Sequence, residues 1–188
     1  MKIPVEISVR HIHISQKDFE KLFGKNKILI FAKELSQPGE FASEQKIVLM
    51  NGNKKIEDVR ILGPFRKDSQ AEISITDAYN LKLNPLPKIK ISGDISDTIK
   101  ILVKEQNLSI KIPCIIAQRH LHCSANEAEK LGLKNNQKIS VKIKGIRETT
   151  FHNIVVRVSE QYRLSLHLDT DEGNSAGISK KMFGEIVS

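Results

Sequence analysis

A six-residue motif occurs twice in this chain of 188 residues, and it constrains the fold more than any other feature of the sequence. Arg10-His11-Ile12-His13-Ile14-Ser15 recurs as Arg119-His120-Leu121-His122-Cys123-Ser124. Each copy follows an apolar run typical of a β-strand, at 3–9 in the first case and at 110–117 in the second. A motif repeated in the same local context indicates an internal duplication.

Both copies of the motif are followed by a helix signal. Ser15 with Asp18, and Ser124 with Glu127, have the spacing of a capping box, in which an acidic residue follows the capping hydroxyl by three positions. Gly24 then provides a stop signal for the first helix. These signals predict short helices over 16–23 and 125–131.

Weaker similarity extends further along both copies. Ile47-Val48-Leu49 parallels Ile139-Ser140-Val141, and Thr76-Asp77-Ala78 parallels Thr170-Asp171-Glu172. The two Thr-Asp motifs are closer together in the sequence than the two histidine motifs. The first copy is therefore expected to carry an insertion, which we place in the loop around 35–39.

Most of the remaining chain alternates between apolar and polar residues, as half-buried strands do. Many short strands separated by Gly and Pro are typical of β-barrels or sandwiches, here with a few short helices. The stretch 84–98, which contains two prolines, is the expected connector between the copies. Strands are predicted over 46–50, 58–62, 70–75, 99–103, 109–116, 138–144, 151–158 and 163–169.

The histidines of each motif form a pair, because residues i and i+2 of a strand lie on one face. If the preceding apolar runs continue into the motifs, His11 with His13, and His120 with His122, extend an inward-facing apolar stripe. Two neutral imidazoles at the mouth of a barrel are a natural half-site for zinc. The alternative is that the paired histidines cap the core and bond to the backbone, and the duplication favours the metal.

A third ligand is expected from each copy, just before its Thr-Asp motif. His167 lies on the polar face of the strand 163–169, and Glu72 lies on the polar face of the matching strand 70–75. Three protein ligands leave a coordination position open, which is typical of catalytic zinc. His152 has no equivalent in the other copy and is interpreted as a surface or packing residue. The predicted sites are His11, His13 and Glu72 in one copy and His120, His122 and His167 in the other.

Composition narrows the class of protein. The hydrophobic fraction of 39% suits a compact core, and no stretch approaches the roughly 20 apolar residues that cross a bilayer. We expect no signal peptide, because the chain begins on a strand-like pattern, and two cysteines without CxxC spacing fit a reducing compartment. A cytoplasmic location is therefore expected.

The formal net charge of +8 comes from scattered lysines, which fits a solvated surface, a polyanionic small ligand or nucleic acid.

Four stretches taken together resemble the phosphate propanoyltransferase family, the PduL-type phosphotransacylases of bacteria. The resemblance covers nearly the whole chain and keeps the family's order. The stretches are 10–15, the Leu-Ser-Gln-Pro-Gly-Glu-Phe-Ala run at 35–42, the Leu-Gly-Pro-Phe-Arg run at 62–66 leading to Glu72-Ile73-Ser74, and 119–122 with 167–172.

The resemblance implies a mainly β fold, internally duplicated, made of two small β-barrel domains with short capping α-helices. In the family, the N-terminal strand joins the barrel made by the C-terminal half of the chain. Residues 1–9 and 118–188 are thus expected to form one barrel and residues 10–117 the other, with the active site between them.

The resemblance also implies a function. Members of the family transfer an acetyl or propanoyl group between coenzyme A and orthophosphate, and they hold two zinc ions. The first zinc matches His11, His13 and Glu72, where the sulfur of coenzyme A also binds. The family's phosphate-site arginine falls on Arg66. The expected partners are acyl-CoA and phosphate, with a homodimer implied at the level of the family and no nucleic acid or membrane. The second zinc matches His120, His122 and His167.

The chain departs from the family at three points. It shows no N-terminal amphipathic helix of the kind found in members housed in bacterial microcompartments, which favours acetyl over propanoyl transfer. Cys123 stands where the family has Met, and its side chain is expected to face away from the metals. The residues Ser96-Asp97-Thr98 replace a Gly-rich continuation of Ser92-Gly93-Asp94-Ile95, so contacts made by that loop cannot be carried over from the family.

Two other functions are compatible with the same residues. A dinuclear zinc hydrolase of a phosphoester or thioester would use the ligands to activate water. A basic nucleic-acid-binding protein with structural zinc would lose its affinity steeply with salt. We favour direct attack of phosphate on the thioester, because no Walker-type loop or GxSxG elbow is present and neither cysteine is placed to act as a nucleophile.

Overall fold

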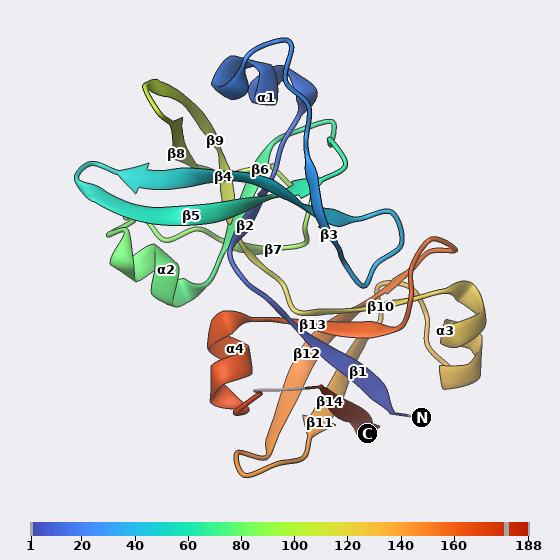
Figure 1. The fold of residues 1–188 in the computed structure, drawn as a ribbon. Helices are drawn as coiled ribbons and strands as arrows, with labels where there is room; N and C mark the ends of the chain where they lie inside the picture. Colours follow the sequence, from blue (N-terminus) through green and yellow to red (C-terminus); the bar gives the residue numbers. More distant parts are fainter. Residues whose placement is uncertain (1, 179–180, 188) are drawn as a thin grey trace. The chain divides into compact units, whose positions relative to one another are not determined.

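The computed structural model describes residues 2–178 and 181–187, which divide into two compact units (Figure 1). Unit 1 comprises the described parts of Met1–Val9, Ser36–Pro38 and Gln118–Ser188, and unit 2 comprises Arg10–Leu35 and Gly39–Ala117. Across the described ranges, none of the helices has the length and apolar character needed to cross a membrane.

Unit 1 is a closed barrel of six strands with two short helices. Its elements are β1 (Ile3–Ser8), β10 (His120–Cys123), α3 (Ala125–Leu131), β11 (Lys138–Ile143), β12 (Thr149–Val158), β13 (Ser165–Asp169), α4 (Thr170–Ser175) and β14 (Met182–Val187). Around the ring the strands follow the order β1, β13, β10, β12, β11, β14, and β14 pairs with β1 to close it. The pairs β1–β13 and β10–β12 are parallel, and the other neighbours are antiparallel.

Unit 2 is a second ring of six strands, with two further strands at its margin. Its elements are β2 (His11–His13), α1 (Gln16–Phe23), β3 (Phe31–Glu34), β4 (Phe41–Asn51), β5 (Lys54–Gly63), β6 (Gln70–Ile73), α2 (Ile75–Asn80), β7 (Ile89–Lys90), β8 (Ile99–Glu105) and β9 (Leu108–Ala117). The ring runs β4, β5, β2, β6, β9, β8 and returns to β4. Strand β3 lies beside β4, and β7 lies beside β9.

The two rings have the same topology, which confirms the predicted duplicated fold of two small β-barrels rather than sandwiches. Strands β2 and β10, which carry the histidine motifs, each have one parallel and one antiparallel neighbour, β5 and β6 in unit 2 and β12 and β13 in unit 1. The strand before each motif belongs to the other unit: β1 precedes β2 but closes the ring of unit 1, and β9 precedes β10 but closes the ring of unit 2.

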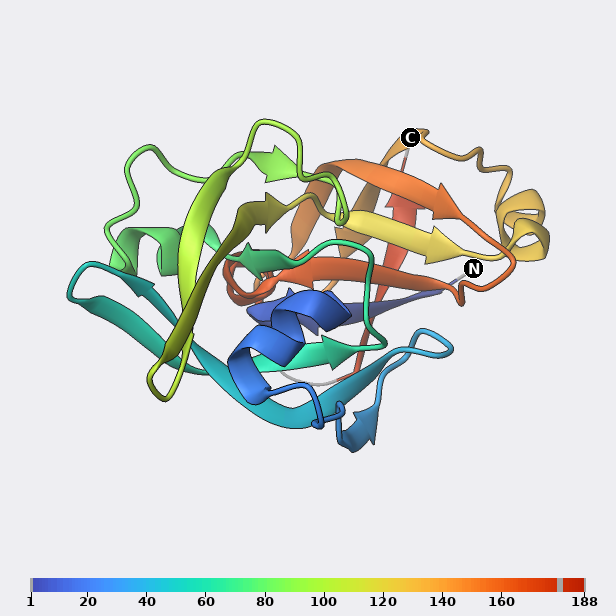
Figure 2. The same cartoon turned by 90° about the horizontal axis from the view of Figure 1, so that it is seen from above.

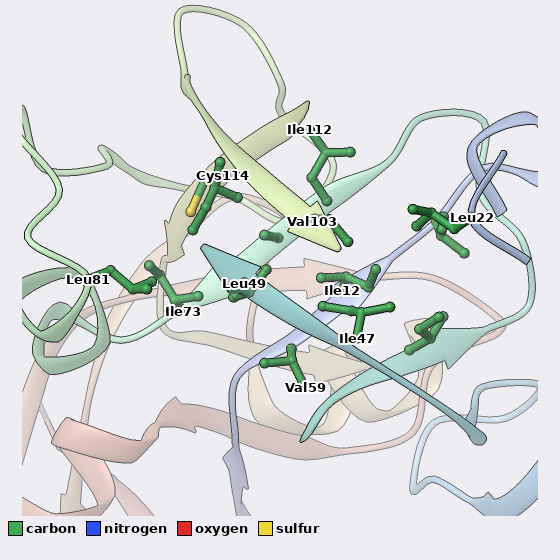
Figure 3. Close-up of a cluster of buried hydrophobic side chains, with 14 of the residues drawn as sticks. Ile12, Leu22, Ile47, Leu49, Val59, Ile73, Leu81, Val103, Ile112 and Cys114 are labelled. Atoms are coloured by element: carbon green, nitrogen blue, oxygen red, sulfur yellow. The ribbon is translucent and has the colours of Figure 1, made fainter. Parts of the chain in front are cut away.

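Each barrel is filled by its own apolar core. The core of unit 2 is drawn in Figure 3, where Ile12 from β2, Ile47 and Leu49 from β4, and Val103 from β8 point toward one another. Helix α1 adds the buried Phe19 and Leu22 to this core and lies over the strands of unit 2 (Figure 2). The core of unit 1 contains Ile3 and Val5 from β1, together with residues of the C-terminal half such as Leu121, Val141 and Leu166.

Helices α1 and α3 have the predicted boundaries, because both predicted caps form. The side chains of Ser15 and Ser124 accept hydrogen bonds from the backbone N–H groups of Asp18 and Glu127, and Gly132 ends α3 with a left-handed φ of 65°. Helices α2 and α4 and strands β3, β7 and β14 were not predicted from the sequence. Strands β4 and β5 are longer than predicted, and β13 begins at Ser165 rather than at 163.

Candidate functional site

Three of the predicted ligands meet in unit 2. Strand β2 pairs with β6 so that His11 lies opposite Glu72 and His13 lies opposite Gln70. The side chains of His11, His13 and Glu72 are buried, with exposed fractions of 6%, 4% and 5%. We call these three residues the first triad.

The expectation that the histidines extend an inward-facing apolar stripe is wrong. The core takes Ile12 and Ile14, so His11 and His13 lie on the other face of β2. The alternation of the run 3–9 does not continue into the motif, because β1 ends at Ser8 and the chain passes from unit 1 to unit 2 after Val9. The same holds in unit 1, where Leu121 belongs to the core and the flanking histidines do not.

The donor atoms of the first triad converge. The Nε2 atoms of His11 and His13 are 3.3 Å apart. The Oε2 atom of Glu72 lies 3.7 Å from Nε2 of His11, and its Oε1 atom lies 3.6 Å from Nε2 of His13. All three donor atoms fall within 4.8 Å of one another, so a single cation could contact them all.

The electrostatics of His13 also suit a metal ligand. Burial, followed by repulsion from His11 and Arg66, holds the pKa of the His13 imidazole well below its usual value of 6.5. His13 is therefore neutral at physiological pH, and a neutral imidazole has the lone pair that a metal requires.

Arg66 lies beside the first triad. Its backbone N–H donates to the carbonyl of Ile14, one residue after His13, at 3.0 Å. Its guanidinium donates from Nη1 to Oγ of Ser92 at 2.9 Å and from Nη2 to Oε1 of Glu40 at 3.3 Å. The side chain remains 33% exposed. A guanidinium has five N–H donors, so these two contacts leave others with which it could bind an anion.

The other three predicted ligands meet in unit 1. Strand β10 pairs with β13 so that His120 lies opposite His167 and His122 lies opposite Ser165. The ring centroids are 4.5 Å apart for His120 and His122, 4.8 Å for His122 and His167, and 5.1 Å for His120 and His167. Their donor atoms also lie within 4.8 Å of one another. We call these residues the second triad.

Two neighbours orient the rings of the second triad. Nδ1 of His120 lies 2.8 Å from the carbonyl oxygen of Gln118. Since a carbonyl only accepts, Nδ1 must carry the proton, and Nε2 keeps its lone pair for a ligand. The ring of Tyr162 stacks on His122 with centroids 4.0 Å apart, and Cζ of Arg157 lies 5.6 Å from the centroid of Tyr162.

Both triads fit zinc by the chemistry of their donors. Imidazole nitrogens and a carboxylate are common zinc ligands, and three of them leave at least one position for water or substrate. The fixed tautomer of His120 and the lowered pKa of His13 prepare the rings for this role.

The remaining histidine and the cysteines lie outside the two triads. His152 is exposed, and its Nδ1 lies 2.8 Å from Oγ of Ser140. Cys114 is fully buried in the core of unit 2, and Cys123 is fully buried in the core of unit 1. Neither thiol is exposed to a substrate in this structure.

Ser92 and Tyr162 were not predicted from the sequence as neighbours of the triads. Nothing in the local sequence distinguishes Tyr162, which approaches His122 through the fold alone. Ser92 stands in a stretch that resembles the family, but its contact with Glu72 depends on the path of a loop. The predicted alignment of the two Thr-Asp motifs is wrong by one residue. Asp77 and Glu172 are each the third residue after a helix cap, so Asp77 is equivalent to Glu172 and not to Asp171.

Comparison with known proteins identifies relatives along the whole chain. The sequence model of the phosphate propanoyltransferase family matches residues 4–179. A phosphate propanoyltransferase of Alkaliphilus metalliredigens is 38% identical over 189 residues, which cover 100% of this chain and 88% of that protein. Proteins of the same name from Escherichia fergusonii and Thermotoga maritima are 43% and 40% identical, and each match covers 93% of this chain and 83% of the relative. The chain therefore belongs to the phosphate propanoyltransferase family.

Proposed function

We propose that this protein reversibly transfers a short acyl group between coenzyme A and orthophosphate, so that acyl-CoA and phosphate give acyl phosphate and free CoA. The observation that carries the proposal is the position of Arg66, a partly exposed arginine hydrogen-bonded to a serine that in turn contacts the carboxylate of the first triad. Membership of the family, whose relatives are named phosphate propanoyltransferases, supports the same reaction.

In this proposal Arg66 binds the phosphate and orients one of its oxygens toward the thioester carbonyl. Phosphate is a poor nucleophile unless it is held close to the carbon it attacks, and a guanidinium can hold two of its oxygens through parallel N–H donors. Attack forms the new C–O bond, and the C–S bond breaks as the thiolate leaves. The acyl group passes directly from sulfur to oxygen in a ternary complex, without an acyl-enzyme.

The first and second triads are the residues that would hold zinc, one ion each. Zinc supplies Lewis acidity toward a carbonyl or phosphoryl oxygen and an affinity for thiolate sulfur. The protein's own contribution is to keep His13 neutral, to fix the tautomer of His120, and to place the phosphate-binding arginine beside the first triad. The acyl groups that we propose as substrates are acetyl and propanoyl.

The reaction is tested by adding acetyl-CoA or propanoyl-CoA to zinc-loaded protein, with and without phosphate, and measuring free thiol and acyl phosphate. We expect thiol release only with phosphate, and one acyl phosphate for each thiol. Release at the same rate without phosphate would instead identify a thioester hydrolase.

The role of Arg66 is tested in the same assay. Arg66→Ala should lower kcat/KM for phosphate by roughly 10- to 100-fold, the range expected for losing hydrogen bonds to a charged group. Arg66→Lys should also be impaired, because a single ammonium does not reproduce the two parallel donors. The matched control is Lys67→Ala, which removes the neighbouring exposed positive charge and should behave as wild type. If both Arg66 variants kept the wild-type kcat/KM for phosphate, Arg66 would have no role in binding phosphate.

A further inference from the structure

One serine in a loop of unit 2 connects the phosphate-binding arginine with the first triad. Ser92 lies in the stretch 91–98 between β7 and β8. Its Oγ donates a hydrogen bond to Oε1 of Glu72 and accepts one from Nη1 of Arg66 at 2.9 Å. These two contacts put a single hydroxyl group between a candidate metal ligand and a candidate substrate-binding group.

The chemistry of a hydroxyl makes this arrangement directional. A serine hydroxyl has one proton to donate and lone pairs with which to accept. An ionised carboxylate can only accept and a guanidinium can only donate, so the proton of Ser92 must point to Glu72 and a lone pair must face Arg66. Alanine can make neither contact, whereas threonine can make both.

We propose that Ser92 is a positioning residue that orients the Glu72 carboxylate for the metal and holds Arg66 in place for phosphate. The two oxygens of Glu72 face different histidines, with Oε1 near His13 and Oε2 near His11. A hydrogen bond that fixes Oε1 therefore fixes the rotation of the whole carboxylate. Hydrogen-bond partners of metal ligands typically change metal affinity or activity by about 10- to 100-fold when they are removed.

The loop that carries Ser92 is itself held in place by a side chain from the strand of Glu72. Gln70 is buried and lies two residues before Glu72 on β6, so both side chains lie on the same face of the strand. Its Oε1 accepts from the backbone N–H of Gly93 at 2.8 Å, and its Nε2 donates to the backbone carbonyl of Asp94 at 2.9 Å. Gly93 has a φ of +94°, a conformation that strongly favours glycine. Ser92 is thus placed by hydrogen bonds between its loop and a buried side chain.

The part of the inference that concerns phosphate rests on the proposed function, and the part that concerns the metal does not. The first experiment therefore measures zinc affinity, by competition with a chromophoric chelator, in wild type, Ser92→Ala and Ser92→Thr. We expect Ser92→Ala to bind one of two zinc ions about 10- to 100-fold more weakly and the other unchanged. Ser92→Thr should recover most of the loss.

The matched control is Ser96→Ala. Ser96 is an exposed hydroxyl on the same loop that bonds to Asp94 and Lys90. This variant should bind both zinc ions as wild type does. A lower melting temperature in Ser92→Ala with both zinc affinities unchanged would show a merely structural serine and would overturn the inference.

The second experiment measures the KM for phosphate and the KM for acetyl-CoA separately. We expect Ser92→Ala to raise the KM for phosphate several-fold more than that for acetyl-CoA, because Arg66 loses a fixed partner while the thioester keeps its own contacts. Equal changes in both constants would contradict a link to Arg66. If wild type shows no phosphate-dependent release of CoA, the proposed function fails, and the zinc titration alone decides the role of Ser92.

Discussion

At the scale of single residues, burial separates the two cysteines from the chemistry next to them. Both thiols are fully buried. Burial, together with the negative charges of Asp77 and Glu72, raises the pKa of Cys114 from 9.0 to about 12, and burial and Glu127 raise that of Cys123. Only a thiolate is a good nucleophile, so both groups are inert at neutral pH, in agreement with direct transfer from CoA to phosphate.

The raised pKa of Cys114 predicts how stability depends on pH. The folded protein holds the thiol proton more tightly than the unfolded chain does, so the stability it contributes is complete below pH 9 and is lost as the pH rises toward 12. Between pH 8 and pH 11, wild type should lose about 2–3 kcal/mol more unfolding free energy than Cys114→Ala, since each pKa unit is worth about 1.4 kcal/mol. Urea titrations at several pH values measure both proteins, and other titrating groups cancel in the difference. If the difference in unfolding free energy between wild type and Cys114→Ala stayed the same at every pH, the prediction would be contradicted.

The six candidate ligands illustrate what the sequence could predict at this scale. The duplicated motifs and the repeat register were enough to group them as the two triads that the structure brings together. That they bind zinc stays a prediction. Ser92 could not be predicted, because its contact depends on Gln70 holding a loop that lies more than twenty residues further along the chain.

At the scale of secondary-structure elements, capping residues determine where the short helices begin. Helices α1 and α3 could be predicted because each begins directly after a histidine motif, at a serine followed by an acidic residue three positions later. Helices α2 and α4 have only six residues each, too few to show a helical period, although each has a full capping box. The pairs Ser74 with Asp77 and Asp169 with Glu172 were the signals that could have revealed them.

The capping carboxylates of α2 and α4 each bind the arginine that begins a histidine motif. Nε of Arg10 donates to Oδ1 of Asp77 at 2.8 Å, and Nη1 of Arg119 donates to Oε1 of Glu172 at 3.1 Å. In each unit this ion pair ties the start of the histidine strand to the helix that follows the strand of the third ligand. The same contact in both copies indicates that it serves to assemble the triads.

Removing this contact should destabilise unit 2 measurably. Asp77 is 2% exposed, and Asp77→Ala loses both a helix cap and a hydrogen bond that the charged Arg10 donates to this buried carboxylate. We expect a loss of about 2–3 kcal/mol in the free energy of unfolding, measured in urea. The control is Glu57→Ala, which removes an exposed ion pair with Lys55 at 2.7 Å and should change stability by less than about 0.5 kcal/mol. Equal effects of the two substitutions would show that burial of Asp77 contributes nothing.

At the scale of the whole molecule, the duplication explains why there are two similar triads. Glu72 and His167 occupy equivalent places, each two residues before the cap of the following helix, yet one is a carboxylate and the other an imidazole. Strand β1 closes the ring of unit 1 and β9 closes the ring of unit 2, although each directly precedes the histidine strand of the other unit. The family resemblance implied this arrangement. The periodicity of the sequence could not, because a strand has the same alternating pattern whichever sheet it joins.

Because each triad is built within one compact unit around its own core, the two should bind metal independently. We predict two zinc ions per chain in wild type, measured by elemental analysis after dialysis against trace zinc. His120→Ala should retain one ion and lose nearly all turnover, since the second triad would keep only two ligands, too few for a stable catalytic zinc. The control is His152→Ala, an exposed histidine outside both triads, which should retain two ions and normal turnover. Loss of both ions in His120→Ala would show that the triads are coupled, and full turnover after complete removal of zinc would exclude a catalytic role for either.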